Sequence, residues 1–228
     1  MAIFVSTGAF AGKELDRFPV PTALASAHYQ CDQMIHKERY DICYSYKLKA
    51  PLWTRFYITK AELEKKPASR DDDKFYEETS IPAKYRAKLA DYRSSGYDRG
   101  HVTSSRSMAF TNKAQASTYT LANCQPEYPE HNRGIWRYTE TLARKLASKA
   151  GEAVIYTGGV FDPINPKRIG PGRIAVPAKT YKIVYFPKSR ESVGFLVPNI
   201  PEDQGKKPSK FRVELKDIEK ESGFKFNL

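Results

Sequence analysis

Runs of β-branched and aromatic residues dominate the second half of this sequence and constrain its fold more than any other feature. Such residues favour strands because their side chains pack well on a pleated surface. The runs cover residues 153–161, 180–186 and 192–200, and two earlier segments with strand character cover 39–49 and 52–60. Segment 39–49 alternates large apolar residues with polar or small ones, as a strand does. These patterns predict a central antiparallel sheet.

Helical segments accompany these strands. The clearest covers 132–151, where apolar residues fall close to helical spacing and Gly151 provides a C-terminal stop. The apolar positions of that segment are Ile135, Tyr138, Leu142 and Leu146. A short helix is expected over 213–223, and the long polar stretch 61–96 is expected to carry one helical piece over 83–92. Helices packed outside an antiparallel sheet define an α+β fold.

The chain shows no internal repeat, no low-complexity tract and no convincing domain boundary. We therefore expect a single domain over 1–228, which is long enough to bury a substantial core. Residues 1–35 contain Pro19 and Pro21 but little strand or helix signal. They are expected to form a loosely structured lead-in.

Basic residues exceed acidic ones, with 38 Lys and Arg against 26 Asp and Glu, for a net charge of +12. A polyanion is the natural partner of such a chain, and nucleic acid leads because its phosphates bind Lys and Arg. An anionic membrane surface, or solubility alone, would account for the same excess. No apolar run approaches the roughly 20 residues that a bilayer-spanning helix needs, so we expect no stable membrane insertion. The first residues do not resemble a signal peptide, and a mature form whose signal has been removed would start in the same way.

The three cysteines, Cys31, Cys43 and Cys124, contain no pair at zinc-finger spacing. One interpretation joins Cys31 to Cys43 in a disulfide. The other makes all three small buried apolar residues.

The segment Asp98–His101, with the sequence DRGH, combines an acid, a base, a glycine and a histidine. On a strand, alternation would place Arg99 and His101 on one face and Asp98 on the other. A neutral imidazole, with an ordinary pKa near ~6.5, can accept a proton from water at physiological pH. Gly100 would leave room for the close approach of a backbone. Taken alone, however, the tetrapeptide is explained better by a salt-bridged turn.

The helix at 132–151 adds a second group of polar residues at intervals of four, namely Asn132, Trp136, Glu140 and Arg144. This spacing places them along one side of the helix. Asn132 is either an N-cap or a neutral oxygen ligand for Mg²⁺, which binds few protein oxygens and keeps several waters. Glu140 either forms an ion pair with Arg144 or holds one of those waters.

Together these residues resemble the DNA/RNA non-specific endonucleases, which are ββα-metal nucleases. The shared pattern is DRGH, a strand ending in Asn123, and then Asn, Trp, Glu and Arg at intervals of four from Asn132 to Arg144. Further segments that resemble the family are spread over most of the chain. The resemblance implies a ββα-metal motif and a metal-dependent enzyme that hydrolyses phosphodiester bonds in DNA and RNA.

The resemblance also implies a role for each matching position. His101 would be the general base that activates water, and Asn132 the only direct protein ligand of one Mg²⁺, for which Mn²⁺ can substitute. Glu140 would hold a water of the metal's shell, and Asn123 would orient the site. Three arginines would contact phosphate or stabilise the charge of the transition state, and these are Arg70, Arg99 and Arg144.

Two features depart from the family pattern. The family usually has Gln four residues after the strand-end asparagine, where this chain has Glu127, and the segment 102–105, VTSS, replaces the usual residues after the histidine. His131, next to Asn132, is tempting as a second metal ligand. We expect it to face solvent instead, because a one-metal site of this type needs only the asparagine and waters.

Two other functions would fit parts of the pattern. A non-catalytic nucleic-acid-binding protein on the same fold would explain the charge but has no need of His101, Asn132 and Glu140. A phosphodiesterase for small molecules or lipids would leave the net charge of +12 unexplained. We therefore expect DNA and RNA substrates. A non-specific nuclease is hazardous beside a genome, which favours a secreted or periplasmic location or a protein inhibitor, and a homodimer is compatible with the sequence.

Overall fold

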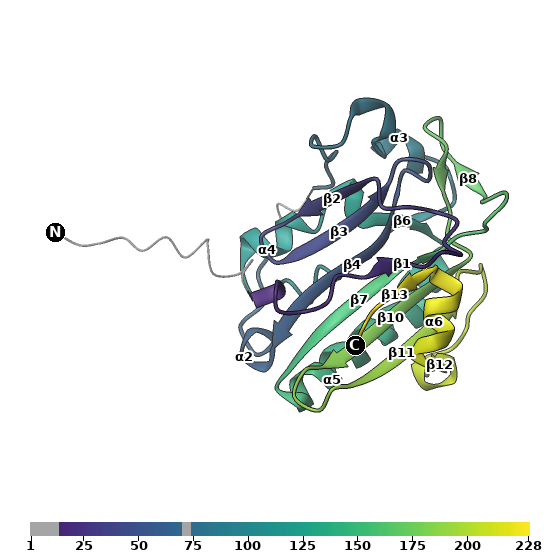
Figure 1. Ribbon diagram of the computed structural model, residues 1–228. Helices are drawn as coiled ribbons and strands as arrows, with labels where there is room; N and C mark the ends of the chain where they lie inside the picture. Colours follow the sequence, from purple (N-terminus) through teal and green to yellow (C-terminus); the bar gives the residue numbers. More distant parts are fainter. Residues whose placement is uncertain (1–13, 70–73) are drawn as a thin grey trace.

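The computed structural model describes residues 14–69 and 74–228, and a large antiparallel sheet forms its centre (Figure 1). The strand order is β12-β11-β10-β7-β4-β3-β2, and every neighbouring pair is antiparallel. The strands are β2 Gln33–His36, β3 Tyr40–Ser45, β4 Ala50–Thr59, β7 Glu152–Val160, β10 Lys179–Phe186, β11 Glu191–Pro198 and β12 Arg212–Val213. The predicted α+β class with a central antiparallel sheet is confirmed.

The two faces of this sheet pack against different helices. Helix α6, Leu215–Ser222, lies in front of the sheet in Figure 1, and helix α5, Arg137–Ala150, lies behind it. We call these the α6 face and the α5 face. On β7, Val154 and Tyr156 join the core under α6, whereas Ile155 joins the core under α5. This alternation follows from the period of two along a strand. It buries β7 on both faces and explains its nearly continuous apolar sequence.

Three two-stranded sheets accompany the large one. Strand β5, Asp98–His101, pairs with β6, Cys124–Glu127, and so forms the two strands of the predicted ββα motif. Strand β1, Thr22–Ala23, pairs with β13, Phe224–Lys225, near the C-terminus. Strands β8, Arg168–Ile169, and β9, Ile174–Ala175, form the third pair.

The described part of the expected lead-in, residues 14–35, is tied to the rest of the protein. Strand β1 pairs with β13, and β2 begins within the lead-in, at Gln33. A disulfide joins Cys31 to Cys43 of β3, with their Cα atoms 5.3 Å apart, so the first interpretation of the cysteines holds. Cys124 is free and buried. Residues 1–13 lie outside the described residues.

The predicted helix over 83–92 is wrong. The structure has a 3₁₀ turn at Ala83–Tyr85 and one turn of helix α3 at Leu89–Tyr92, separated by extended backbone. Each piece is held by a distant partner. The ring of Tyr85 stacks on Tyr46 at 4.3 Å, and the Asp91 carboxylate accepts a hydrogen bond from the backbone of Gly172. Tertiary contacts therefore override the local helical pattern.

The remaining helices are short. They are α2 Lys60–Leu63, α4 Asn112–Ser117, and 3₁₀ turns at Leu121–Asn123 and Pro208–Phe211. None of the helices in the described ranges has the length and apolar content needed to cross a bilayer.

The helix predicted over 132–151 ends as expected, because Gly151 has a φ of +91° that other residues rarely adopt. Its start differs. Residues His131–Trp136 form a wide π-helical turn with Gly134 in a non-helical conformation, and regular helix begins only at Arg137. The fully buried side of α5 consists of Thr139, Ala143 and Ala147, not of Tyr138, Leu142 and Leu146. Small side chains on this side let the helix approach the sheet closely.

Candidate active site

The strand pair β5–β6 sets the positions of the DRGH residues. His101 lies opposite Cys124, Gly100 opposite Gln125, and Asp98 opposite Glu127. A Cβ atom on Gly100 would come within 2.2 Å of Cδ of Glu127. Gly100 therefore makes room for a buried side chain, not for a backbone as the sequence suggested. The glycine and the unusual Glu127 are parts of one packing arrangement.

Arg99 and His101 do lie on the same side of β5, since both contact Phe75. The guanidinium carbon of Arg99 lies 4.7 Å from the centre of the Phe75 ring, and the ring centres of His101 and Phe75 are 5.3 Å apart. The edge of Tyr119 packs against His101 at 4.8 Å. Phe75 and Tyr119 also pack against each other at 5.0 Å, so the imidazole belongs to a cluster of three rings that restricts its orientation.

Asn123 fixes the backbone that follows His101. Its Oδ1 accepts a hydrogen bond from the Thr103 amide at 2.8 Å, and its Nδ2 donates to the carbonyls of Thr103 at 3.0 Å and Thr118 at 2.9 Å. Its own carbonyl accepts from the Val102 amide at 2.9 Å. Asn123 is fully buried. These contacts hold the backbone of Val102 and Thr103, the two residues that follow His101, in place.

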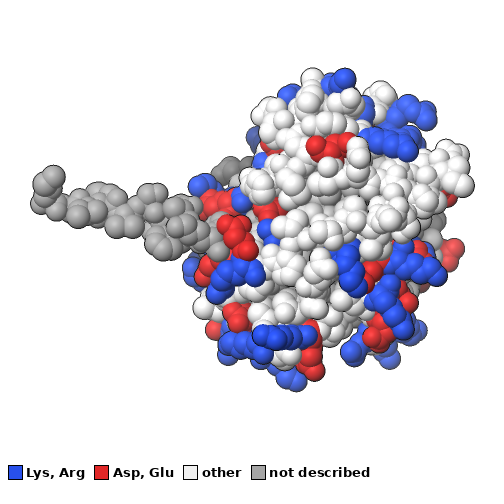
Figure 2. All heavy atoms as spheres, in the orientation of Figure 1, with Lys and Arg blue, Asp and Glu red and all other residues white. Residues whose placement is uncertain are grey.

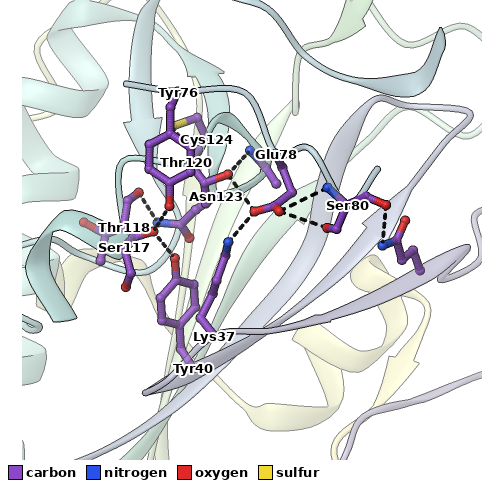
Figure 3. A network of polar contacts seen from close by, with 12 residues as sticks. Lys37, Tyr40, Tyr76, Glu78, Ser80, Ser117, Thr118, Thr120, Asn123 and Cys124 are labelled. Atoms are coloured by element: carbon purple, nitrogen blue, oxygen red, sulfur yellow. Dashed lines mark hydrogen bonds and ion pairs between the residues drawn. The ribbon is translucent and has the colours of Figure 1, made fainter. Parts of the chain in front are cut away.

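A network of polar contacts connects Asn123 to Glu78 and Lys37 (Figure 3). The Asn123 amide donates to the Thr120 carbonyl at 2.9 Å, and the Thr120 hydroxyl donates to the Glu78 carboxylate at 3.2 Å. Glu78 also binds Ser80 and forms an ion pair with Lys37, which follows β2. Burial raises the pKa of Glu78, but the hydrogen bond from Lys37 and those from Ser80 outweigh it and leave the pKa below its ordinary value. The charged network thus links the site to the edge of the large sheet.

Asn132 lies in the π-helical turn, where its side chain contacts Asp98 of β5. Its Nδ2 donates to Oδ2 of Asp98 at 2.9 Å, and Arg133 donates to the same carboxylate at 2.6 and 2.7 Å. The N-cap interpretation of Asn132 is wrong, because the turn is preceded by Glu130 and Asn132 is already inside it. Holding Nδ2 on a carboxylate leaves the amide oxygen as the atom available to a cation.

A cavity of about 610 Å³ brings the predicted residues together. His101, Asn132, Glu140 and Arg144 all line it. The ion pair with Arg144, one of the two interpretations of Glu140, is not among the close ion pairs of the described residues, and Arg144 donates to Thr141 at 3.0 Å and to Ser104 at 3.4 Å. The Glu140 carboxylate still acts on Arg144 at longer range, since its charge raises the pKa of that arginine.

The other predicted residues lie outside this cavity. Arg99 lines an adjoining cavity of about 270 Å³, which also includes Phe75 and shares His101 and Asn132 with the larger one. Arg70 lies outside the described residues. Sequence reasoning missed Arg106 and Arg137, which line the main cavity, although the segment before Arg106 had been identified as unusual. Neither arginine falls on the interval of four from Asn132 to Arg144, so the spacing did not reveal them.

Two ionisable side chains are buried behind the site. Burial is the main reason that the pKa of Glu127 rises to about 8 and that of Lys182 falls to about 8. Gln125 donates to Oε1 of Glu127 at 3.0 Å, and Lys182 donates to the Thr157 hydroxyl at 2.7 Å. Glu140 influences both groups, raising the pKa of each. Glu127 is therefore close enough to Glu140 to sense its charge and is not in contact with solvent.

His131 is buried, so the expectation that it faces solvent is wrong. Its Nε2 lies 3.0 Å from the Thr180 hydroxyl, and its ring stacks on Trp136 at 5.6 Å. Burial lowers the pKa of His131 to about 4. It is a neutral core residue on the α5 face and does not line the cavity.

The net positive charge is not spread as a single patch over the α6 side of the molecule. Figure 2 shows this side with a broad uncharged middle and with Lys and Arg mixed among Asp and Glu toward its lower part. Ion pairs such as Lys179 with Glu221 and Lys225 with Glu219 account for part of that mixing.

Comparison with known proteins agrees with this arrangement. A family model described as DNA/RNA non-specific endonuclease matches residues 22–228. Nuclease C1 of Cunninghamella echinulata var. echinulata is 31% identical over 84% of this chain and 81% of its own length, and human mitochondrial endonuclease G is 29% identical over 85% and 69%. A crystal structure titled as the EndoG/EndoGI complex shares the fold, with a TM-score of 0.82, 23% identity, and coverage of 97% of this chain and 93% of the other. The chain belongs to the DNA/RNA non-specific endonuclease family.

Proposed function

We propose that His101 is the general base of this metal-dependent DNA/RNA non-specific endonuclease and that Asn132 and Glu140 hold its cation, which we assign as Mg²⁺. The observation that carries the assignment is the single cavity shared by His101, Asn132, Glu140 and Arg144. A base, an oxygen ligand, a carboxylate and a phosphate-binding cation are the groups that phosphodiester hydrolysis needs.

The residues of the cavity suit a hard cation. The described residues contain no group of three or more His, Cys, Asp or Glu side chains that could hold a metal. A zinc ion, which prefers such a set, is therefore disfavoured. The Asn132 amide oxygen, oriented by Asp98, and the nearby Glu140 carboxylate match Mg²⁺, which keeps several of its waters, and Mn²⁺ can replace it. When bound, this cation neutralises charge on the phosphate and assists the departing oxygen.

His101 takes one proton from the attacking water as the water oxygen bonds to phosphorus and the bond to the leaving oxygen breaks. Its ring is oriented for this step by Phe75 and Tyr119. Arg144 and Arg99, in the two adjoining cavities, bind phosphate oxygens on either side of His101. Arg70 is proposed as a further stabiliser of transition-state charge on the resemblance alone. Because these groups contact the phosphates of the nucleic acid and not the edges of its bases, cleavage shows little sequence preference.

Several aspects of the biological setting belong to the same proposal. The solved complex named above pairs a related nuclease with an inhibitor, which supports a protein inhibitor for this chain as well. The name of the human relative gives a mitochondrial location, which does not match the secreted or periplasmic location expected from the sequence. We propose a compartment separated from the genome, where the Cys31–Cys43 disulfide would persist in an oxidising environment. A single domain and a homodimer remain part of the proposal.

Cleavage of supercoiled plasmid tests the assignment. The wild-type protein is expected to degrade plasmid in Mg²⁺ and to lose this activity in EDTA. His101→Ala should lose it by about 10²–10⁴-fold while DNA binding, followed by fluorescence anisotropy, persists. His28→Ala, an exposed histidine outside the cavity, is the matched control and should cleave normally. Equal cleavage by His101→Ala and wild type would refute the general base, and intact plasmid with wild-type protein would favour a binding-only protein.

A further inference from the structure

The active-site cavity continues into a second cavity that none of the proposed catalytic steps uses. This second cavity, of about 230 Å³, lies between α2, α5 and the chain after Arg106. The two cavities share Arg106, Thr141 and Arg144 in their linings. A groove therefore runs from His101 past the two arginines and ends between α2 and α5.

The second cavity carries unpaired positive charge. Lys65, Arg106 and Lys145 line it, and none of them takes part in the ion pairs of the described residues. Its acidic residues are engaged elsewhere, since Glu62 binds Arg39 and Glu64 lies 3.6 Å from Lys60. Burial lowers the pKa of Arg144, the Glu140 carboxylate partly offsets this, and the nearby charge of Arg106 lowers the pKa further. An anion bound between the two arginines would relieve this repulsion.

One wall of the same cavity is apolar. Leu63, Pro67 and Phe110 form it, and Leu63 and Phe110 are only partly buried. The guanidinium of Arg39 lies 4.7 Å from the centre of the Phe110 ring and is itself held by Glu62. The ring is therefore fixed in place before any ligand arrives. A phosphate alone would make no favourable contact with an apolar wall, whereas a nucleotide has both a phosphate and an aromatic base.

We propose that this second cavity binds the nucleotide next to the scissile phosphate and accepts it from a single strand. The phosphate lies among the basic residues of the cavity, Lys65, Arg106, Arg144 and Lys145, and the base lies against Phe110. The inference rests on the proposed function, because it takes the main cavity as the place of the scissile phosphate. In a duplex the bases are stacked and paired, so moving one onto Phe110 requires that it first be unpaired and unstacked. In a single strand the base is already accessible, and stacking on an aromatic ring favours its binding.

The segment 102–105, which departs from the family pattern, leads directly into the junction between the two cavities. Ser104 and Ser105 line the main cavity, Arg106 lines both, and Ser107 lines the second. The Ser104 hydroxyl accepts a hydrogen bond from Arg144 at 3.4 Å, which holds this arginine toward the junction. The residues after His101 therefore affect which strand can continue past the scissile bond.

Steady-state cleavage by a charge-removal variant tests the proposal. The double variant Lys65→Ala/Lys145→Ala removes two charges from the second cavity and leaves the main cavity unchanged. The matched control, Lys149→Ala/Lys188→Ala, removes two exposed charges that line neither cavity, one of them on the same helix as Lys145. The substrates are a single-stranded 12-nucleotide DNA, the same sequence as a duplex, and thymidine 5′-(p-nitrophenyl phosphate), which is too short to reach the second cavity.

We expect the cavity variant to raise KM for the single strand about tenfold, with less than a threefold change for the duplex and for the short substrate. Its log KM should depend less steeply on log salt, by about 0.7 for each lost phosphate contact. Phe110→Leu, with folding checked by thermal denaturation, should raise the same KM by about fivefold or more, since base stacking is lost. Identical single-strand KM values for the cavity variant and its control would overturn the proposal. Failure of wild-type protein to cleave the short substrate would instead contradict the proposed function.

Discussion

The α6 face and the α5 face of the large sheet are built from the same strands but carry different side chains. On β4, β7 and β10 the α6 face presents Trp53, Tyr156 and Tyr181, which pack with Phe224 and Phe226 of the C-terminal segment. The neighbouring positions Thr54, Thr157 and Lys182 are buried and polar. Thr54 bonds to Thr103, just after His101, and Lys182 bonds to Thr157 beneath α5.

Because of this difference, the α6 face contributes mainly to stability, whereas the α5 face adjoins the candidate active site. The α6 face buries large aromatic side chains, whose removal from water is the main source of folding free energy. The α5 face also has an apolar part, with Phe56, Ile58 and Ile155. Next to that part, however, it buries polar and ionisable groups that cost free energy unless they are paired. We infer that the α6 face supports the fold strongly enough for the α5 face to hold an active site.

The largest expected effect on stability comes from the α6 face. Phe226 is fully buried, and its ring packs against Tyr156 at 5.5 Å and Tyr181 at 5.9 Å. Phe226→Ala should lower the free energy of unfolding by about 3–5 kcal/mol, because it leaves a cavity in the core. The kcat of the protein that remains folded should change less than twofold. Urea denaturation and plasmid cleavage at 25 °C measure the two quantities. A large fall in kcat without loss of stability would contradict the inference that the α6 face contributes mainly to stability.

A smaller change in the free energy of unfolding, this time a gain, is expected from a substitution of the buried residue Glu127. The pKa of Glu127 is raised in the folded protein to about 8, so its carboxyl stabilises the fold fully below its unfolded pKa. That contribution is lost progressively as the pH rises from the unfolded pKa to about 8. Glu127→Gln, which restores the usual family residue and keeps the shape, should therefore be close to neutral at pH 5. At pH 8 it should stabilise the protein by about 1–3 kcal/mol.

Denaturant titrations of the Glu127→Gln variant and wild type at pH 5, 7 and 8.5 provide the measurement. Glu127→Asp, which keeps the charge, is the control and should retain a decline in stability with rising pH. If the stability difference between Glu127→Gln and wild type did not grow with pH, ionised Glu127 would not destabilise the folded state.

The sequence predicted those features whose cause is local. Segments 153–161, 180–186 and 192–200 became β7, β10 and β11 because β-branched and aromatic residues specify strands over short distances. The candidate site residues were predicted from their spacing on one strand and one helix, and their roles stay predictions. His101, Asn132 and Glu140 indeed share a cavity.

The features that were missed depend on residues far apart in the chain. Nothing near His131 shows that Thr180 of β10 will cover its ring, and nothing near residue 86 shows that Tyr46 will hold Tyr85 and interrupt the helix. The same holds for the second cavity, since Leu63, Arg106 and Lys145 come from three separate segments. Periodicity reports which side of an element is buried, but not which distant residue it meets.

The smallest effect is expected at the surface beside the candidate site, where Arg133 and Asn132 bind the same carboxylate of Asp98. Arg133 is 72% exposed, and surface ion pairs contribute little because water and salt screen them. Arg133→Ala should therefore leave the Mg²⁺ concentration for half-maximal cleavage within about twofold of wild type. Asp98→Ala, which frees the Asn132 amide to rotate, should raise that concentration about 10–100-fold. Plasmid cleavage over a Mg²⁺ titration compares the variants, and equal shifts for both would mean that the surface ion pair, and not the Asp98–Asn132 hydrogen bond at 2.9 Å, orients the metal ligand.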